Sequence, residues 1–175
     1  MNDIEIRDNV LSSYSFNKFQ KTILNPGFSW FCGNIIDPNK GEMLCDDLDN
    51  YQLGHSFFNN SPNDCFPTKS SDAEILNPII FKMRVVAWKR IKANLNPKTS
   101  SIIKHGFHVD YNDKHMKTSI FYVNSNDGYT EFEDGTIIES IANRLVTFPS
   151  NLRHTGTTCT NKSYRVVINF NYFSG

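Results

Sequence analysis

Two histidines and an aspartate are the residues of this chain best suited to hold a metal ion. His108 and Asp110 are two positions apart, and side chains at that spacing on a strand point to the same face, about 6.5–7 Å apart. His154 follows RLVTFPSNLR, which is typical of a strand and a proline-containing turn. Two imidazoles and a carboxylate form the facial triad of non-haem iron(II) sites, although zinc enzymes use similar ligands. The pattern predicts a divalent metal site at these three residues.

An arginine on the last predicted strand could hold an anion near that metal. In SYRVVINFNYF a period of two places Arg165 on one face together with Val167, Asn169 and Asn171. A guanidinium in such a strand is costly unless it meets an anion, and its planar fork matches a carboxylate. The partner is either an internal Asp or Glu or, as we favour, a dicarboxylate ligand whose other end binds the metal. Asn169 and Asn171 would then line the cavity.

The elements that position these residues begin near residue 84, where the hydrophobic pattern changes to a period of two. Short strand-like segments separated by Asn, Asp, Gly and Pro indicate an antiparallel sandwich or barrel with helices packed outside: VVAWKRIKANL, TSIFYVN, YTEFE, TIIESI, RLVTF and SYRVVINFNYF. In the first of them, Arg90, Lys92 and Asn94 form a polar face, which either lines a pocket or faces solvent.

The first half of the chain mixes helical and extended patterns. Residues 10–24 have apolar residues near helical spacing and predict a helix, and residues 28–36 predict a strand. Residues 40–71 are polar and predict a long loop that could act as a lid over the site. We expect a second helix from an Asp72 cap to about Phe81, bent or shortened by Pro78.

The remaining histidines and the tryptophans have simpler interpretations. His105 is three positions before His108 and would point to the opposite strand face, so it and His115 are predicted to be surface residues. His55 lies in the polar 40–71 segment with no partner evident from the sequence. Trp30 and Trp88 are predicted to belong to the core.

Length, charge and cysteine content limit the possible classes of protein. The chain has 175 residues, enough for one domain, and its 18 basic and 18 acidic residues give no net charge to attract nucleic acid or an anionic membrane. MNDIEIRDNV lacks the apolar core of a signal peptide, and no window reaches membrane-spanning length. We therefore expect a cytoplasmic protein, located in the host cytoplasm if it is viral. The four unclustered cysteines, Cys32, Cys45, Cys65 and Cys159, are then expected to be reduced thiols.

Taken together, HVD, the distal histidine and the arginine resemble the iron(II)- and 2-oxoglutarate-dependent dioxygenases. The pattern is most similar to the prolyl-hydroxylase-like branch and to short oxygenases encoded by bacteriophages. Three more stretches carry the likeness: SIFYVN, GYTEF in place of a GGTEF-type turn, and RLVTFPSNLRHTG. The resemblance covers about residues 84–173, and residues 1–83 would supply helical and loop support within a single domain spanning residues 1–175.

This resemblance implies a mainly β fold with flanking helices, the double-stranded β-helix, a cupin-like jelly roll. It also implies that His108, Asp110 and His154 bind Fe(II) and that Arg165 binds the far carboxylate of 2-oxoglutarate. Tyr122 occupies the place of a tyrosine whose hydroxyl often helps bind that carboxylate; the alternative is a core aromatic residue. The implied reaction consumes O2 and 2-oxoglutarate, releases succinate and carbon dioxide, and hydroxylates a C–H bond, with ascorbate as a supporting reductant.

Two other classes of protein stay open at this point. One is a cupin-like metalloenzyme that does not use 2-oxoglutarate, and the other is a non-catalytic jelly-roll binding module. For an oxygenase, the resemblance favours a peptide or protein side chain as substrate, then a small polar metabolite, with Asn94, Asn169 and Asn171 in the pocket wall. Nucleic acid ranks third, and no membrane partner is expected.

Overall fold

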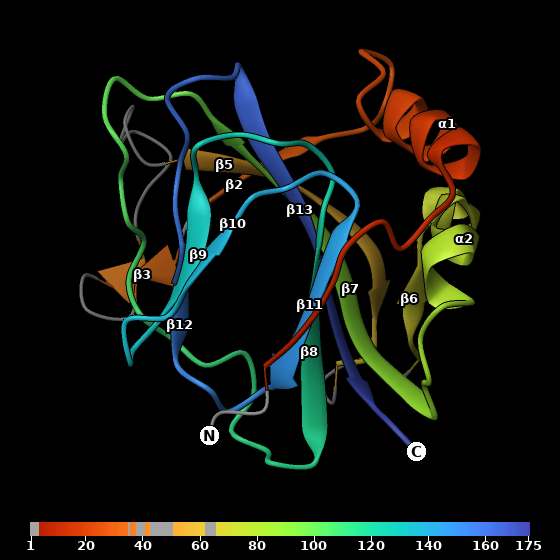
Figure 1. Cartoon of the computed structure of the whole chain (residues 1–175). Helices are drawn as coiled ribbons and strands as arrows, with labels where there is room; N and C mark the ends of the chain where they lie inside the picture. The colour runs from red at the N-terminus through yellow and green to blue at the C-terminus, as the bar shows by residue number, and fades with distance from the viewer. Residues whose placement is uncertain (1–3, 35, 38–40, 43–50, 62–65) are drawn as a thin grey trace.

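Two antiparallel sheets and a layer of helices make up the computed structural model, which describes residues 4–34, 36–37, 41–42, 51–61 and 66–175 (Figure 1). The larger sheet has the order β1 (Glu5–Arg7), β11 (Arg144–Pro149), β8 (Met116–Tyr122), β13 (Tyr164–Phe173), β7 (Ala87–Pro97), β5 (Tyr51–Asn59) and β2 (Phe31–Asn34), with β6 (Thr68–Lys69) beside β5. The smaller sheet has the order β10 (Ile137–Glu139), β9 (Tyr129–Phe132) and β12 (His154–Gly156). A further pair joins β3 (Ile36–Asp37) to β4 (Gly41–Glu42). The predicted jelly roll is confirmed.

Hydrophobic side chains fill the space on both faces of the larger sheet. Between the two sheets lies a core of Ile120, Tyr122, Phe132, Ile138, Val146, Phe148 and Val167. A larger core lies between the sheet and the helices, and Trp30 and Trp88 pack against it as predicted. Strand β13 serves both cores, because Val166, Ile168 and Phe170 face the helices while Val167 faces the smaller sheet. The predicted alternation of β13 is therefore confirmed.

The predicted N-terminal helix is present as α1 (Ser13–Ile23), and it packs outside the larger sheet (Figure 1). The Ser12 hydroxyl accepts a hydrogen bond from the Ser15 amide at 3.3 Å and caps its first turn. Phe19 and Ile23 are buried in the helix-side core. The apolar spacing in residues 10–24 therefore identified the correct helix and the correct buried face.

The predicted second helix has a different form. It is a 3-10 helix, η1 (Ser71–Leu76), followed by one turn of α-helix, α2 (Asn77–Ile80). The cap is Ser70, whose hydroxyl accepts from the Asp72 amide at 3.1 Å, so the predicted Asp72 cap was wrong. Pro78 has no amide hydrogen and cannot continue an α-helical ladder, which explains the break between the two pieces.

The prediction of a loop over residues 40–71 was wrong for β5, which pairs with β7 along most of its length. Phe57 and His55 point to the helix-side core, where the His55 ring nitrogens lie 2.7 Å from the Ser29 carbonyl and 2.9 Å from the Ser70 hydroxyl. His55 therefore has partners and a structural role. Since β5 is built into the sheet, it cannot be a lid; residues 43–50 and 62–65 of this segment lie outside the described residues.

Two further findings concern cysteines and membrane helices. Cys32 is an exposed free cysteine and Cys159 a buried one, whereas Cys45 and Cys65 lie outside the described residues. Within the part of the chain that is described, no helix is long and apolar enough to cross a membrane.

Asn143 joins the segment before α1 to the larger sheet, and its replacement should destabilise the fold. It has φ 65°, and its side chain accepts a bond from the Leu11 amide at 2.9 Å and donates one to the Leu11 carbonyl at 2.8 Å. Because both Leu11 groups are buried, Asn143→Ala should lower the free energy of unfolding by about 2–4 kcal/mol, as measured by chemical denaturation. Asn9→Ala is the matched control, because Asn9 also has a positive φ (52°) but is exposed. If both variants lost the same free energy of unfolding, the cause would be the positive φ of the backbone and not the hydrogen bonds to Leu11.

Candidate metal centre and its cavity

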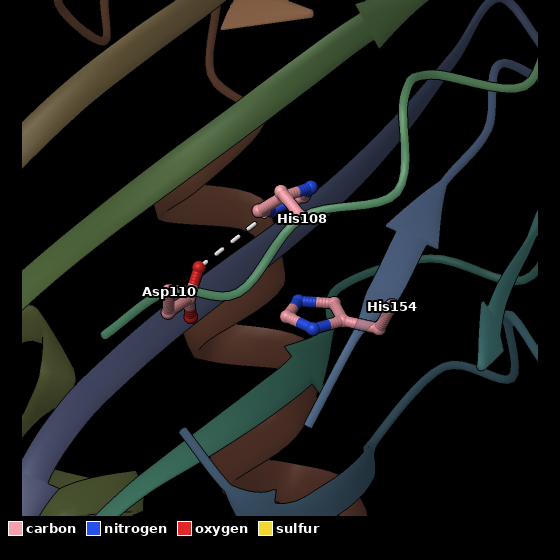
Figure 2. A group of neighbouring side chains, drawn as sticks. All are labelled: His108, Asp110 and His154. Carbon is pink, nitrogen blue, oxygen red and sulfur yellow. Dashed lines mark ion pairs between the residues drawn. The ribbon is translucent and has the colours of Figure 1, made fainter. Parts of the chain in front are cut away.

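His108, Asp110 and His154 come together at one end of a cavity between the two sheets. Each offers one ligand atom, and these atoms all lie within 4.8 Å of one another. His108 Nε2 is 3.7 Å from Asp110 Oδ1. Figure 2 shows His108 and Asp110 on the connection between β7 and β8, with His154 facing them from β12.

The local backbone around the first two residues differs from the expected strand. His108 forms an isolated bridge with His154, in which each amide donates to the other residue's carbonyl at 2.9 Å. Asp110 lies on a bend, where its amide donates to the Ser150 carbonyl at 3.2 Å. The side chains therefore converge because the 108–110 segment is pinned to residues 150–154, and not through regular strand alternation.

Backbone carbonyls fix both imidazoles in the form that binds metals. His108 Nδ1 lies 3.0 Å from the Gly106 carbonyl, and His154 Nδ1 lies 2.9 Å from the Leu152 carbonyl. A carbonyl can only accept, so each Nδ1 carries a hydrogen and Nε2 is the nitrogen that can bind a metal. Burial, opposed by the Asp110 carboxylate, lowers the pKa of His154 and favours its neutral form.

The Asp110 carboxylate is held by three side chains. Its Oδ2 accepts hydrogen bonds from Asn171 at 2.7 Å and Thr118 at 3.0 Å, and Arg90 Nη2 lies 3.6 Å from Oδ1. Desolvation raises the pKa of Asp110, but His154, Arg90 and Asn171 together outweigh it, so the pKa lies below its usual value. Asn171, predicted to line the pocket, instead orients this carboxylate.

This donor set fits a divalent metal ion. Two imidazoles that can offer Nε2 and one ionised carboxylate are borderline ligands suited to iron, zinc and related ions. The carbonyls behind the imidazoles and the amide behind the carboxylate are the outer partners that metal ligands ordinarily have. The ligand types do not by themselves select one metal.

Arg165 lines the same cavity and is buried, with 2% of its surface exposed. Its Nε donates to the Ser140 hydroxyl at 2.8 Å and its Nη2 to the Thr130 hydroxyl at 3.1 Å. No carboxylate among the described residues lies within 4.0 Å of it. Burial lowers the pKa of Arg165, yet a guanidinium stays protonated in proteins. The internal acid that the sequence left open is thus absent from the described part of the chain.

Tyr122 belongs to the wall that holds Arg165. The guanidinium carbon lies 5.7 Å from the centre of its ring, and the tyrosine hydroxyl donates to the Thr130 hydroxyl at 2.8 Å. Burial raises the pKa of Tyr122, so the phenol stays protonated. Tyr122 and Arg165 therefore share Thr130 as a partner.

Gly128 makes room for this arrangement, which the sequence analysis did not foresee. A Cβ at this position would overlap the Thr158 carbonyl and would lie 2.7 Å from Arg165 Cδ. Sequence reasoning also missed Thr130 and Ser140, the two hydroxyls that hold the guanidinium. A strand period of two, which puts Thr130 on the same face as Phe132, was the one sequence signal that Thr130 faces inward.

The cavity between these groups has a volume of about 410 Å³, within the usual range for small-molecule sites. Asn94 and Asn169 line it, and His105, which was predicted to be at the surface, also lines it. The His105 amide donates to the Gly156 carbonyl of β12 at 3.0 Å, so pairing with that strand turns the residue inward. His115 is exposed, in agreement with the prediction.

Comparison with known proteins identifies the fold. No protein-family model matches the chain, and no curated protein matches its sequence. A prolyl-4-hydroxylase from Pseudomonas putida superposes with a TM-score of 0.61 at 12% identity, covering 100% of this chain and 94% of that one. The viral collagen prolyl hydroxylase of Paramecium Bursaria Chlorella virus-1, in its 2OG complex, gives 0.61 at 12% identity over 98% and 96%.

A third similar structure is the epimerase SnoN in complex with Fe3+, alpha-ketoglutarate and nogalamycin RO, with a TM-score of 0.63 at 8% identity over 99% of this chain and 79% of that one. At such identities the likeness shows the fold and not the reaction. The fold predicted from the resemblance, that of the prolyl-hydroxylase-like 2-oxoglutarate oxygenases, is confirmed. The relation to bacteriophage enzymes stays a prediction.

Proposed function

We propose that this protein is an Fe(II)- and 2-oxoglutarate-dependent oxygenase that hydroxylates a C–H bond. One observation carries the proposal: a triad of metal-binding type and a buried arginine without an acidic partner in the described residues line one cavity. The similar prolyl hydroxylases and SnoN support it. The structure of the viral prolyl hydroxylase holds 2OG, and that of SnoN holds alpha-ketoglutarate.

In this proposal the metal and the cosubstrate are held by different residues. His108, Asp110 and His154 would hold iron(II), which when bound would couple the decarboxylation of 2-oxoglutarate by O2 to oxidation of a substrate C–H bond. Arg165 would bind the far carboxylate of 2-oxoglutarate through its fork, while Ser140 and Thr130 keep that fork in place. Ascorbate would serve only as a supporting reductant.

The remaining residues of the site orient these groups and limit water. Asn171 and Thr118 fix the Asp110 carboxylate before a metal arrives, which lowers the cost of assembling the site. The apolar side chains of Ile120 and Val167 face the cavity between the triad and Arg165. They reduce the water around the reacting groups and so strengthen the electrostatic contacts there.

Anaerobic titration with Fe(II) and 2-oxoglutarate tests this proposal. We expect a visible metal-to-ligand charge-transfer band that saturates at one equivalent of each. A metalloenzyme of another cupin-like class would bind the metal and give no band on adding 2-oxoglutarate. A non-catalytic jelly-roll module would bind neither, so the three classes give three different results.

For the substrate we propose a peptide or protein side chain or a small polar metabolite. Two similar structures are prolyl hydroxylases and the third holds nogalamycin RO, so both classes have support. Succinate release should rise above its uncoupled background with prolyl peptides or with free metabolites. Stimulation by nucleic acid alone would contradict this expectation.

A further inference from the structure

One wall of the cavity, apart from Arg90 at its end, has no role in holding the metal or the cosubstrate. Strand β7 presents every second side chain to the cavity: Arg90, Lys92, Asn94 and Asn96, with Gln52 beside them from β5. The sequence left open whether this polar face meets a pocket or solvent. Because these side chains line the cavity, their charges and amides act on whatever enters it.

The charged groups of the cavity are not balanced. Among the described residues that line it, three cations, Arg90, Lys92 and Arg165, face the single carboxylate of Asp110. A divalent ion and a doubly charged 2-oxoglutarate would cancel each other, so an excess of two positive charges would persist. Charges taken out of water are costly unless they are paired. The cavity therefore favours a further anion.

Lys92 is the cation left without a partner. Arg90 is 3.6 Å from Asp110 and donates to Asn171 at 3.1 Å, and Arg165 is held by Ser140 and Thr130. Lys92 has no carboxylate within 4.0 Å in the described part of the chain. Burial and the neighbouring Arg90 lower its pKa. Its side chain lies over Gly54, where a Cβ would be 2.9 Å from Lys92 Cε, so the backbone of β5 leaves it room.

Three asparagines on this wall and on the strand opposite carry side-chain oxygens without partners among the described residues. The side-chain oxygens of Asn94, Asn96 and Asn169 are buried and have no hydrogen-bond partner in the described structure. Asn169 is directly opposite Lys92 in the β13–β7 ladder. An amide can turn about its Cβ–Cγ bond and present its NH2 group as a donor. A buried polar group without a partner costs about 1–3 kcal/mol, so a ligand that pairs with these amides would be stabilised.

The register also places this subsite close to the metal. The next pair on this face of the ladder is Arg90 with Asn171, and both contact Asp110. Residues two apart on a strand are separated by about 6.5–7 Å. An anionic group on Lys92 would thus lie only a few bonds from a carbon held at the metal.

We infer that Lys92, with Asn94 and Asn169, forms a substrate subsite for an oxyanion, either a carboxylate or a phosphate. This inference rests on the proposed function, since it names the chemical class of the molecule to be hydroxylated. It predicts a substrate with an acidic group near the oxidised carbon, in contrast to a proline within a neutral peptide.

Calorimetry on matched ligand pairs tests the inference. The protein is loaded with Zn(II) and 2-oxoglutarate to exclude turnover, then titrated with N-acetylproline against N-acetylprolinamide and with glycerol phosphate against glycerol. In each pair, the first compound carries an anionic group and the second is neutral. At least one anionic member should bind tenfold or more tightly than its neutral partner. The pair that responds tells carboxylate from phosphate.

Lys92→Met and Lys92→Gln should abolish that preference and leave the affinity for 2-oxoglutarate unchanged. Lys89→Met is the matched control, because Lys89 lies on the same strand but outside the cavity and donates to the Asn60 carbonyl. Equal binding of both members of each pair, or a preference that survives in both Lys92 variants, would overturn the inference. So would a loss of 2-oxoglutarate affinity in them. Failure of the proposed function is recognised separately, because the wild-type protein would then give no charge-transfer band with Fe(II) and 2-oxoglutarate.

Discussion

Replacing His154 with alanine, or Asp110 with asparagine, should abolish metal binding at micromolar protein without unfolding the chain. A zinc site with four ligands binds with about 10–16 kcal/mol, about 3 kcal/mol per ligand. Loss of one of three ligands should therefore weaken the affinity by about a hundredfold or more. Asp110→Asn keeps the volume of the side chain and an oxygen that can accept from Asn171 and Thr118, so its effect isolates the charge.

Anaerobic calorimetry with Fe(II), repeated with Zn(II), measures this effect, and thermal unfolding of the metal-free variants checks that the fold persists. His115→Ala is the matched control, because His115 is an exposed histidine outside the site. Wild-type affinity in both site variants would show that these residues do not bind the metal. An equal loss in His115→Ala would instead indicate nonspecific binding to histidines.

The sequence predicted the parts of the site that follow from strand alternation. Arg165 and Asn169 face the cavity while Val166 and Ile168 face the helices, because a strand between two layers must send alternate residues into different surroundings. The same rule identified β7 as a strand with one polar face. It could not tell a polar cavity from solvent, since both accept charged side chains.

Strand β5 was mistaken for a loop for the same physical reason. Its cavity side carries Gln52 and Gly54, and its helix side includes His55, whose ring is satisfied by residues distant in sequence. Tyr51, Leu53 and Phe57 do follow a period of two, but His55 interrupts it, so the apolar pattern is too short to indicate a strand. Its place in the sheet is fixed by pairing with β7, which no local pattern reveals.

The positions of the histidines depended on tertiary pairing as well. Counting three residues back from His108 places His105 on the opposite face of a regular strand, but the segment is not regular. It follows β12 through hydrogen bonds from the amides of His105 and His108. The hydroxyls that hold Arg165 come from β9 and from the residue after β10, so no spacing in the sequence joins them.

Replacing Arg165 should weaken 2-oxoglutarate binding while leaving metal affinity unchanged. Truncating one partner of a buried charge-assisted pair costs about 2–5 kcal/mol, so Arg165→Met should raise the Kd of 2-oxoglutarate about a hundredfold. Arg165→Lys should recover only part of this loss, because an ammonium keeps the charge but loses the two-pronged geometry. Titration of the charge-transfer band measures the Kd, and calorimetry with Zn(II) measures the metal affinity.

Arg144→Met is the control, since Arg144 lies on β11, pairs with Asp8 and does not line the cavity. In the methionine variant, Ser140 and Thr130 lose a donor, but each hydroxyl can turn toward water entering the emptied space, so a folded protein is expected. A bidentate carboxylate contact predicts that the affinity for 2-oxoglutarate falls from the wild type to Arg165→Lys and again to Arg165→Met. Simple charge attraction predicts equal affinities for the wild type and Arg165→Lys. Unchanged affinity in both variants would mean that another cation holds the cosubstrate, and Lys92, in the same cavity, would be the first residue to examine.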